Sequence, residues 1–271
     1  MKRLPFCLII LLGLVGTPAL AADMEARWVS PPPAEAPWSW TGFYIGGGAG
    51  GSWTRSETKL TLVNGATPIF LAPDVGRVNF LGSPNLASLT GAFGGRVGYN
   101  YQTGPYVWGL EGDVWSIRSH NSINSAPGSP FVAGAVAGSF AAFNTSVNTD
   151  WVATIGPRFG FAADRVMLYA LGGVAFGNVS FTSSYLALNS AGVNFANASA
   201  SQTQVGWTIG GGLDYGINKY WILSVDYQHI DLGYLKNSAL VTTVGAANTA
   251  TFNFSTLVHT DIVTLGLAYK F

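Results

Sequence analysis

The chain has 271 residues, of which only 10% are charged, 13% are aromatic and 35 are glycine. Soluble domains carry roughly 25% charged residues, so this composition indicates an apolar environment around much of the surface. Past the first twenty residues there is no run of about 18 apolar residues, which excludes a bilayer-spanning helix. Because only helices and closed barrels can cross a bilayer, the composition predicts a membrane β-barrel. The formal net charge is zero and no basic patch stands out, which argues against nucleic acid as a partner.

The N-terminal segment has the pattern of an export signal. Two positive charges in the first three residues precede an apolar run at 6–15 and a small-x-small cleavage pattern at 19–21. These features predict a cleaved signal peptide over residues 1–21. The only cysteine, Cys7, lies inside this leader, so we expect no disulfide and no cysteine metal site in the mature protein.

A proline-rich stretch follows the leader. Residues 22–39 contain four prolines and predict an extended periplasmic linker. The barrel is then expected over residues 40–271.

Segments of alternating hydrophobicity, separated by turn signals, fill the rest of the chain, as is typical of outer-membrane strands. We expect eight antiparallel strands, at 40–53, 89–101, 106–117, 150–161, 166–179, 204–217, 221–232 and 260–271. Their connections would alternate between tight periplasmic turns and four long extracellular loops, 54–88, 118–149, 180–203 and 233–259. The segments 59–63 and 69–71 flank Asn64-Gly65, a hairpin signal. We expect the first two strands to continue above the membrane there, and 239–244 and 251–258 could do the same; ten strands, with one of these hairpins in the wall, is the alternative.

Side chains should alternate between lipid and the barrel interior. In the last strand Val263, Leu265 and Leu267 would share one face, with smaller and polar residues opposite. A soluble barrel would also alternate, but large side chains near both strand ends favour a membrane barrel, whose interfaces carry aromatic belts. The predicted belt tryptophans are Trp40, Trp108 and Trp221 at the periplasmic ends and Trp53, Trp115, Trp151 and Trp207 at the extracellular ends.

Several motifs resemble one family. The sequence SWTGFYIGG at 39–47, after a proline-rich lead, is similar to the start of the alphaproteobacterial outer membrane immunogenic protein family. The segments 150–160 and 169–177 resemble its fourth and fifth strands. The resemblance implies a small porin-like barrel of the OmpA type. It also implies that Tyr269 and Phe271 belong to a C-terminal signal read by the barrel assembly machinery. The loops resemble nothing that would carry over a ligand.

The interior is expected to hold seven charged side chains: Arg96, Glu111, Asp113, Arg158, Asp214, Asp226 and Lys270. Charges in a narrow interior must pair or stay hydrated. An eight-stranded barrel is just wide enough for side chains to fill. One hypothesis is therefore a salt-bridged plug, and the other is a narrow ion path whose selectivity these charges set.

Other candidate sites are less specific. His229, Asp231, His259 and Asp261 come from facing strand ends and could form a metal site or a polar rim; we assign no metal and no cofactor. His120 with Ser119 or Ser122 is the only candidate for acyl chemistry, and it falls in a predicted loop, so we expect no enzyme. Residues 131–143 are apolar and could bind a partner or extend a strand.

The sequence thus predicts a surface-exposed barrel with an envelope-structural and presentation role. A low-conductance porin, or an adhesin or receptor that acts through its loops, are the alternatives. Lipid, lipopolysaccharide and the assembly machinery are the expected partners, and the oligomeric state is left open.

Overall fold

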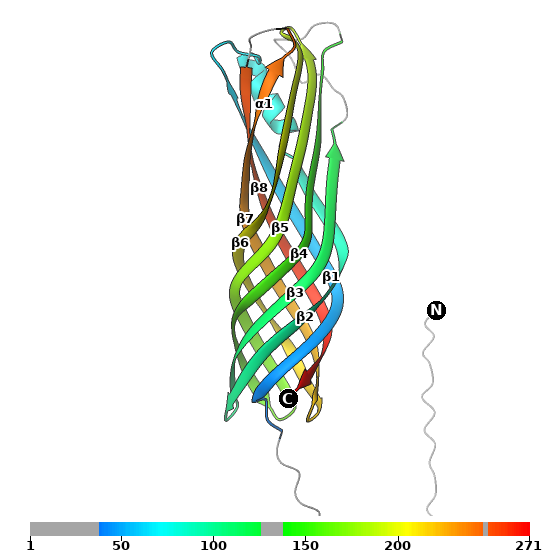
Figure 1. Ribbon diagram of the computed structural model, residues 1–271, viewed down its shortest axis with the longest axis vertical. Helices are drawn as coiled ribbons and strands as arrows, with labels where there is room; N and C mark the ends of the chain where they lie inside the picture. Colours follow the sequence, from blue (N-terminus) through cyan, green and yellow to red (C-terminus); the bar gives the residue numbers. More distant parts are fainter. Residues whose placement is uncertain (1–37, 126–137, 246–248) are drawn as a thin grey trace, which may run out of the picture. The chain divides into compact units, whose positions relative to one another are not determined.

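The computed structural model describes residues 38–125, 138–245 and 249–271, and these form a closed barrel of eight antiparallel strands in which each strand pairs with its sequence neighbours and β1 pairs with β8 (Figure 1). The strands are β1 (Gly42–Asn64), β2 (Asn85–Thr103), β3 (Tyr106–Asn124), β4 (Phe140–Ala163), β5 (Val166–Asn189), β6 (Gly192–Asn218), β7 (Trp221–Thr243) and β8 (Thr249–Lys270). The predicted fold class and strand count are confirmed. The predicted leader, and the linker as far as residue 37, lie outside the described residues.

The alternative of ten strands is wrong. The continuations expected at 59–63, 239–244 and 251–258 fall in β1, β7 and β8, with residue 244 just beyond β7, and the four predicted loops are correspondingly shorter. Residues 60–64 of β1 do not turn back on 69–71 but pair with 250–254 of β8. The strands are 19 to 27 residues long, about twice what a bilayer needs, because they continue far beyond it. The outward-facing residues of these extensions are polar, which gives the extensions the composition of loops. Of the apolar stretch at 131–143, residues 131–137 lie outside the described part of the chain.

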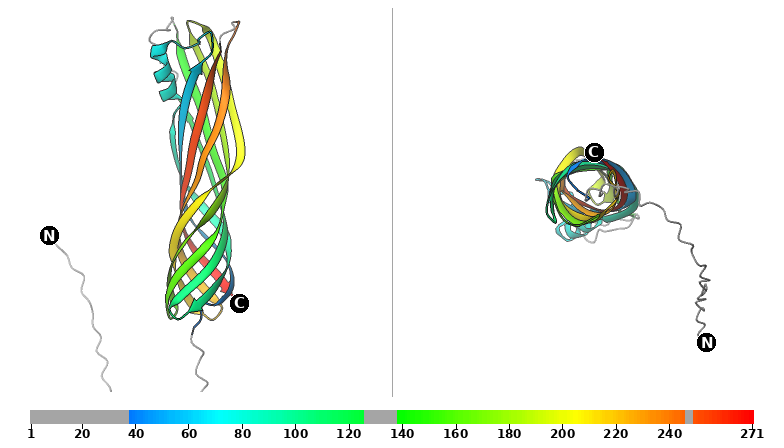
Figure 2. Two further views of the ribbon diagram at one scale, coloured as in Figure 1. Left: turned by 90° about the vertical axis from the view of Figure 1, so that its left-hand side faces the viewer. Right: turned by 90° about the horizontal axis from the view of Figure 1, so that it is seen from below.

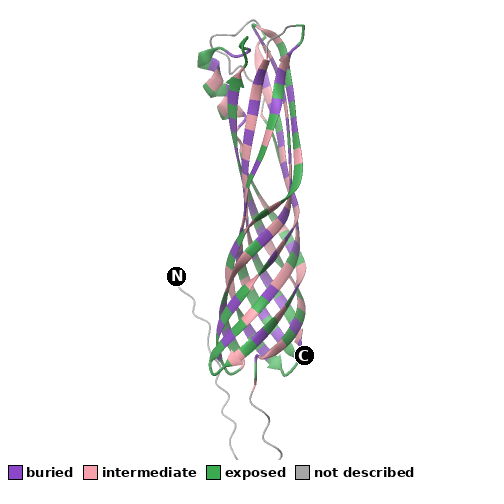
Figure 3. Ribbon diagram, turned by 60° about the vertical axis from the view of Figure 1, so that its left-hand side comes forward, coloured by how far each residue is buried: buried purple, intermediate pink, exposed green. Residues whose placement is uncertain are grey.

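The half of the barrel nearest the tight turns at 104–105, 164–165 and 219–220 has an apolar outer surface. We call it the belt half; it extends from these turns to the level of Trp53 and Trp207. On its outer face Val263, Leu265 and Leu267 are exposed, whereas the residues between them are buried (Figure 3). This alternation is what a membrane barrel requires.

The other half, which we call the rim half, has the opposite polarity. Its interior is packed with large apolar side chains, among them Leu60, Phe181, Phe252 and Phe254, all buried. Its outer face carries exposed or half-buried polar residues such as Lys59, Lys236 and Asn253. The rim half is therefore built like a water-soluble barrel.

A short helix, α1 (Ala72–Leu81), closes a break in the wall of the rim half (Figure 2). β2 begins only at Asn85, so the end of β1 lacks a partner strand on that side. Side chains from α1 and its C-terminal turn take the strand's place: the Leu62 N–H donates to Asn79 Oδ1 (2.8 Å) and the Leu60 N–H to Ser83 Oγ (2.9 Å). Such capping protects an edge that would otherwise attract other strands.

The helix was not expected. Pro73 occupies its first turn, where proline is tolerated because the N–H there is unpaired in any case. Ile69 and Phe70, which precede the helix, do not form a strand. Their side chains are buried and cover the end of the apolar interior. No helix of the described residues is long and apolar enough to cross a membrane.

Two further breaks interrupt the wall. β2 and β3 pair no higher than Phe93 with Ser116, and above that point only side-chain bonds join them. β6 and β7 do not pair between Trp207–Asp231 and Phe195–Thr242.

Candidate functional site: a charged network in the bore

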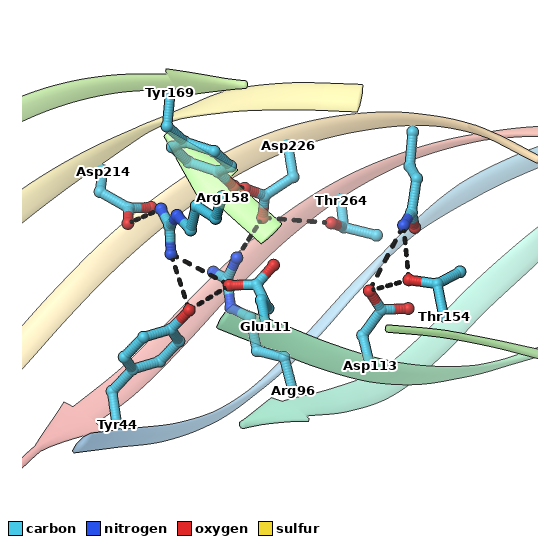
Figure 4. Close-up of polar contacts among 11 residues, drawn as sticks. Tyr44, Arg96, Glu111, Asp113, Thr154, Arg158, Tyr169, Asp214, Asp226 and Thr264 are labelled. Atoms are coloured by element: carbon cyan, nitrogen blue, oxygen red, sulfur yellow. Dashed lines mark hydrogen bonds and ion pairs between the residues drawn. The ribbon is translucent and has the colours of Figure 1, made fainter. Parts of the chain in front are cut away.

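Six of the predicted interior charges meet at one level of the belt half (Figure 4). They come from β2 (Arg96), β3 (Glu111 and Asp113), β4 (Arg158), β6 (Asp214) and β7 (Asp226). The alternation of each strand turns these side chains inward, and the stagger of the barrel brings them to the same height.

Arg158 is the centre of the network, with a side chain only 1% exposed. Its Nη1 donates to Glu111 Oε2 (3.0 Å) and to the Tyr44 hydroxyl (2.9 Å), and its Nη2 donates to Asp214 Oδ2 (2.5 Å). The Tyr44 hydroxyl in turn donates to Glu111, and the Tyr169 ring lies 3.6 Å from the guanidinium carbon. The charge is thus paired with two carboxylates and stacked on an aromatic ring.

Two smaller clusters adjoin this centre. Arg96 Nη1 donates to Asp226 Oδ2 (2.9 Å), and the Tyr169 hydroxyl donates to the other oxygen of the same carboxylate. Asp113 accepts from the Thr154 hydroxyl (2.7 Å) and from the Gln228 amide (3.3 Å). The network therefore contains two guanidinium groups and four carboxyl groups, so a cation that entered it would be favoured over an anion.

The cavity that lies in the bore at this level is small. A cavity of about 20 Å³ remains between Arg96, Glu111, Asp226 and their neighbours. That volume is close to the minimum that holds one water molecule. Above it, Trp115 and Ile262 begin the apolar interior of the rim half.

Trp40 closes the barrel at its turn end, and the prediction that it lies in an aromatic belt is wrong. Its side chain is fully buried beneath Tyr44 and Met167. Its indole N–H donates to the Asp164 carbonyl (3.1 Å), and its backbone N–H donates to Gln102 Oε1 (2.8 Å). The residue precedes β1 and folds under the barrel, so strand alternation does not apply to it.

Lys270, the seventh predicted interior charge, is buried but separate from the network. Its ammonium donates to the carbonyls of Ser39 (2.6 Å) and Thr41 (3.3 Å) and lies 5.3 Å from the Trp38 ring. It fastens the segment before β1 to the end of β8.

The remaining predicted aromatic positions divide by face. Trp53, Trp108, Trp207 and Trp221 are exposed and Trp151 is partly exposed, all on the outer face. The prediction for Trp115 is wrong, because it lies two and four residues from Asp113 and Glu111 and so shares their inward face; it is buried. Tyr269 packs against Tyr220 and Trp221, and Phe271 is 72% exposed. The role of the last two in assembly stays a prediction.

The histidine and aspartate group lies on the outer face at the top of the belt half. His229 bonds Asp261 (2.8 Å), which also accepts from the Tyr227 hydroxyl, while Asp231 is paired in register with His259. Within the described ranges, no three histidine, cysteine, aspartate or glutamate side chains are arranged to hold a metal ion.

The first candidate pair for acyl chemistry, His120 with Ser119, is not assembled, whereas Ser122 is exposed on the same face as His120 and that pairing stays a prediction. Ser119 is buried and bonds Ser88 inside the barrel, whereas His120 points outward and approaches Asp150 at 3.3 Å. The two side chains therefore face opposite sides of β3.

Sequence reasoning missed three members of the network: Tyr44, Tyr169 and Thr154. Tyr44 and Tyr169 belong to β1 and β5, which are so rich in glycine that alternation along the sequence does not show which face is which. The cross-strand pairing of Thr154 with Asp113 would have assigned Thr154 to the interior had the register been known.

Comparisons with known proteins place this architecture among its relatives. A family model described as an outer membrane protein beta-barrel domain matches residues 7–271. The 31 kDa outer-membrane immunogenic proteins of Brucella melitensis and Brucella suis are each 31% identical over 269 residues, covering 96% of both chains. The solved structure of the outer membrane protein OprG from Pseudomonas aeruginosa covers 86% of this chain and 98% of its own, with 11% identity and a TM-score of 0.42.

Proposed function

Because this chain belongs to the family of outer membrane protein β-barrel domains, we propose that it is a closed, non-conducting barrel that serves envelope structure and presents its rim half at the cell surface. It is a protein of the cell outer membrane. The belt half would span the bilayer, and the rim half would stand outside it.

The observation that carries the proposal is the filled bore. The Arg158 network leaves space for about one water molecule. An ion would have to displace paired, buried charges, and leaving a buried charge unpaired is costly. Trp40 below and the cluster of large apolar side chains above, which includes Phe181, Phe252 and Phe254, add two further barriers.

Planar-bilayer recording of the refolded protein tests the closed bore. We expect no discrete conductance steps from the wild type, and none from Arg158→Ala, which should lose only stability. A general porin refolded in the same way serves as the positive control. Steps in the wild type whose size changes in Arg158→Ala would overturn the proposal in favour of a narrow cation path.

Surface presentation is tested separately with an epitope tag. Gly245 and Gly104 lie in turns at opposite ends of the barrel, each with a positive φ and open space around it. A tag after Gly245 should be labelled by antibody on intact cells, and a tag after Gly104 only after permeabilisation. The reverse pattern would refute the orientation.

A further inference from the structure

Arg118 has an unusual backbone for its position. Its φ is +42°, and the one other non-glycine residue of the described chain with a positive φ is Asp164, which lies in a tight turn. Left-handed backbone is unfavourable for residues with a Cβ and persists only where the surroundings impose it. Here it accompanies a β-bulge, since the β3–β4 register shifts between Ser116 and Ser119. Bulges of this kind re-aim side chains.

The re-aimed guanidinium lies on the outer face at the upper edge of the apolar belt. Its carbon lies 5.8 Å from the centre of the Phe93 ring, which is itself exposed. Phe93 and Ser116 are the last residues through which β2 and β3 pair with each other. No described carboxylate forms an ion pair with Arg118; the nearby Asp150 approaches His120 instead.

Below this point, toward the turns, the outer face has a shallow depression. A groove of about 410 Å³ crosses β1 to β4 between the outward side chains of Ile45, Val97, Val114 and Ile155. Its floor includes Gly95 of β2 and Gly112 of β3. Gly95 lies two residues closer to the tight turn than Phe93, and Gly112 lies two residues closer to it than Val114. The groove and the Arg118 guanidinium thus lie one above the other along β2 and β3. The groove is continuous with the lipid-facing surface of the belt half.

We propose that Arg118 and this groove bind an acylated, phosphate-bearing lipid of the outer leaflet, namely the lipid A part of lipopolysaccharide. An acyl chain would lie in the groove, and the phosphate would accept from the Arg118 guanidinium, whose planar fork suits phosphate oxygens. His120, 3.0 Å from the Arg118 carbonyl through Nδ1, would lie beside the headgroup. A cation at the rim of an apolar groove at this height complements a phosphate in charge and an acyl chain in polarity.

The proposal depends on the membrane location of the belt half and not on whether the bore conducts. It is tested on the full refolded barrel by native mass spectrometry in detergent. The probes are lipid A, lipid A without its phosphates, and phosphatidylethanolamine. Two variants separate the two parts of the site, and folding of each is checked by its heat-dependent mobility on a gel.

Arg118→Gln should weaken lipid A binding by about fivefold and leave dephosphorylated lipid A unaffected, since it removes one partly exposed charge contact. Arg118→Lys should restore part of the affinity. Lys236→Gln, on the opposite wall, removes another exposed cation and should change nothing.

Gly112→Leu should weaken both forms of lipid A alike, because a side chain there fills the groove. The Cβ meets nothing closer than 3.6 Å, so the barrel itself should tolerate the change. Gly172→Leu is the matched control, with similar room on β5 and outside this groove.

Three results would overturn the proposal. One is equal binding of phosphorylated and dephosphorylated lipid A by the wild type. Another is an equal loss in Arg118→Gln and Lys236→Gln, which would indicate only general charge attraction. The third is phosphatidylethanolamine binding as tightly as lipid A, with the same loss in Arg118→Gln.

Discussion

The belt half and the rim half are built from the same eight strands, but the polarity of their inner and outer faces is reversed. In the belt half the apolar side chains face outward and a network of charges fills the interior, whereas in the rim half Phe181, Phe252 and Phe254 face inward and lysines face outward. Backbone pairing continues through the transition between β1 and β8 and between β5 and β6, whereas it is interrupted between β2 and β3 and between β6 and β7. What changes is the solvent that surrounds the wall, which decides the face on which apolar side chains are stable.

The two interiors are stabilised in different ways. Buried apolar residues of the rim half need only fit together. Buried charges of the belt half must each find a partner, because an unpaired one is costly. The belt half should therefore lose stability when one buried charged side chain is removed. The rim half should lose stability when a large buried apolar side chain is replaced by a smaller one.

Arg158→Ala should have the largest effect, a loss of about 3–5 kcal/mol in the free energy of unfolding, because Glu111 and Asp214 lose their buried partner. Urea unfolding in vesicles, followed by tryptophan fluorescence, measures it. Replacing all three residues with apolar ones (Arg158→Met, Glu111→Leu, Asp214→Leu) should recover most of the loss. If the triple variant is as unstable as Arg158→Ala, the cost comes from packing and not from unpaired charge.

Leu265→Arg and Leu240→Arg compare the outer faces of the two halves. The side chains are nearly equally exposed, 57% and 58%, but Leu265 lies in the belt half and Leu240 in the rim half. An arginine facing lipid near the middle of a bilayer costs about 2–4 kcal/mol. We expect this loss for Leu265→Arg and almost none for Leu240→Arg; equal losses would mean that lipid surrounds both halves.

Asn79→Ala tests the helix that replaces a strand. It removes the acceptor of the Leu62 N–H and should cost about 1 kcal/mol. Hydrogen exchange at the Leu62 amide should accelerate. Asn253→Ala, which loses only an exposed bond from Ser238, is the control and should leave both quantities nearly unchanged.

Tyr185→Phe should have the smallest effect, and in the opposite direction. The Tyr185 hydroxyl is buried among phenylalanines of the rim half and, in the described part of the chain, has no hydrogen-bond partner. Removing it should stabilise the barrel by up to about 1 kcal/mol. Urea midpoints near neutral pH measure the difference, and a destabilised variant would reveal a partner for the hydroxyl.

The same residue gives a pH dependence. Burial raises the pKa of the Tyr185 phenol above its ordinary value of 10.0, so the folded state holds the proton more tightly than the unfolded state. This contribution is fully present below pH 10 and is lost as the pH rises above it. Wild-type stability should therefore decline above pH 10 more steeply than that of Tyr185→Phe.

Much of the belt half could be predicted from the sequence, because lipid imposes a simple pattern. The alternation of Val263, Leu265 and Leu267 and the tight turns were enough to give the strand count and the interior position of Arg158. Trp40 was misplaced because it belongs to no strand, and Trp115 because position along a strand was weighed above the face it shares with Asp113.

The rim half was harder to predict. Its strands keep period-two alternation, but their outward Ser, Thr and Asn residues resemble loop composition, so the sequence indicated some continuations, such as 59–63 and 251–258, but not their full extent. The helix α1 caps an edge that exists only because β2 starts late, a feature that depends on the register of strands far apart in the chain. The Arg118 bulge is likewise a property of the β3–β4 register.

The opposite polarity of the two halves is tested most directly by spin labels placed singly along β8, from position 251 to 269. Cys7, the only cysteine of the sequence, lies in the predicted leader, so each introduced cysteine would be the single labelling site of the mature barrel. Collision rates with oxygen report lipid and those with a nickel chelate report water. Outward positions 263, 265 and 267 should favour oxygen, outward positions 251, 253 and 255 should favour nickel, and the inward positions between them should be shielded from both. Oxygen preference that continued to position 251, or nickel access to the inward positions of the belt half, would contradict the account.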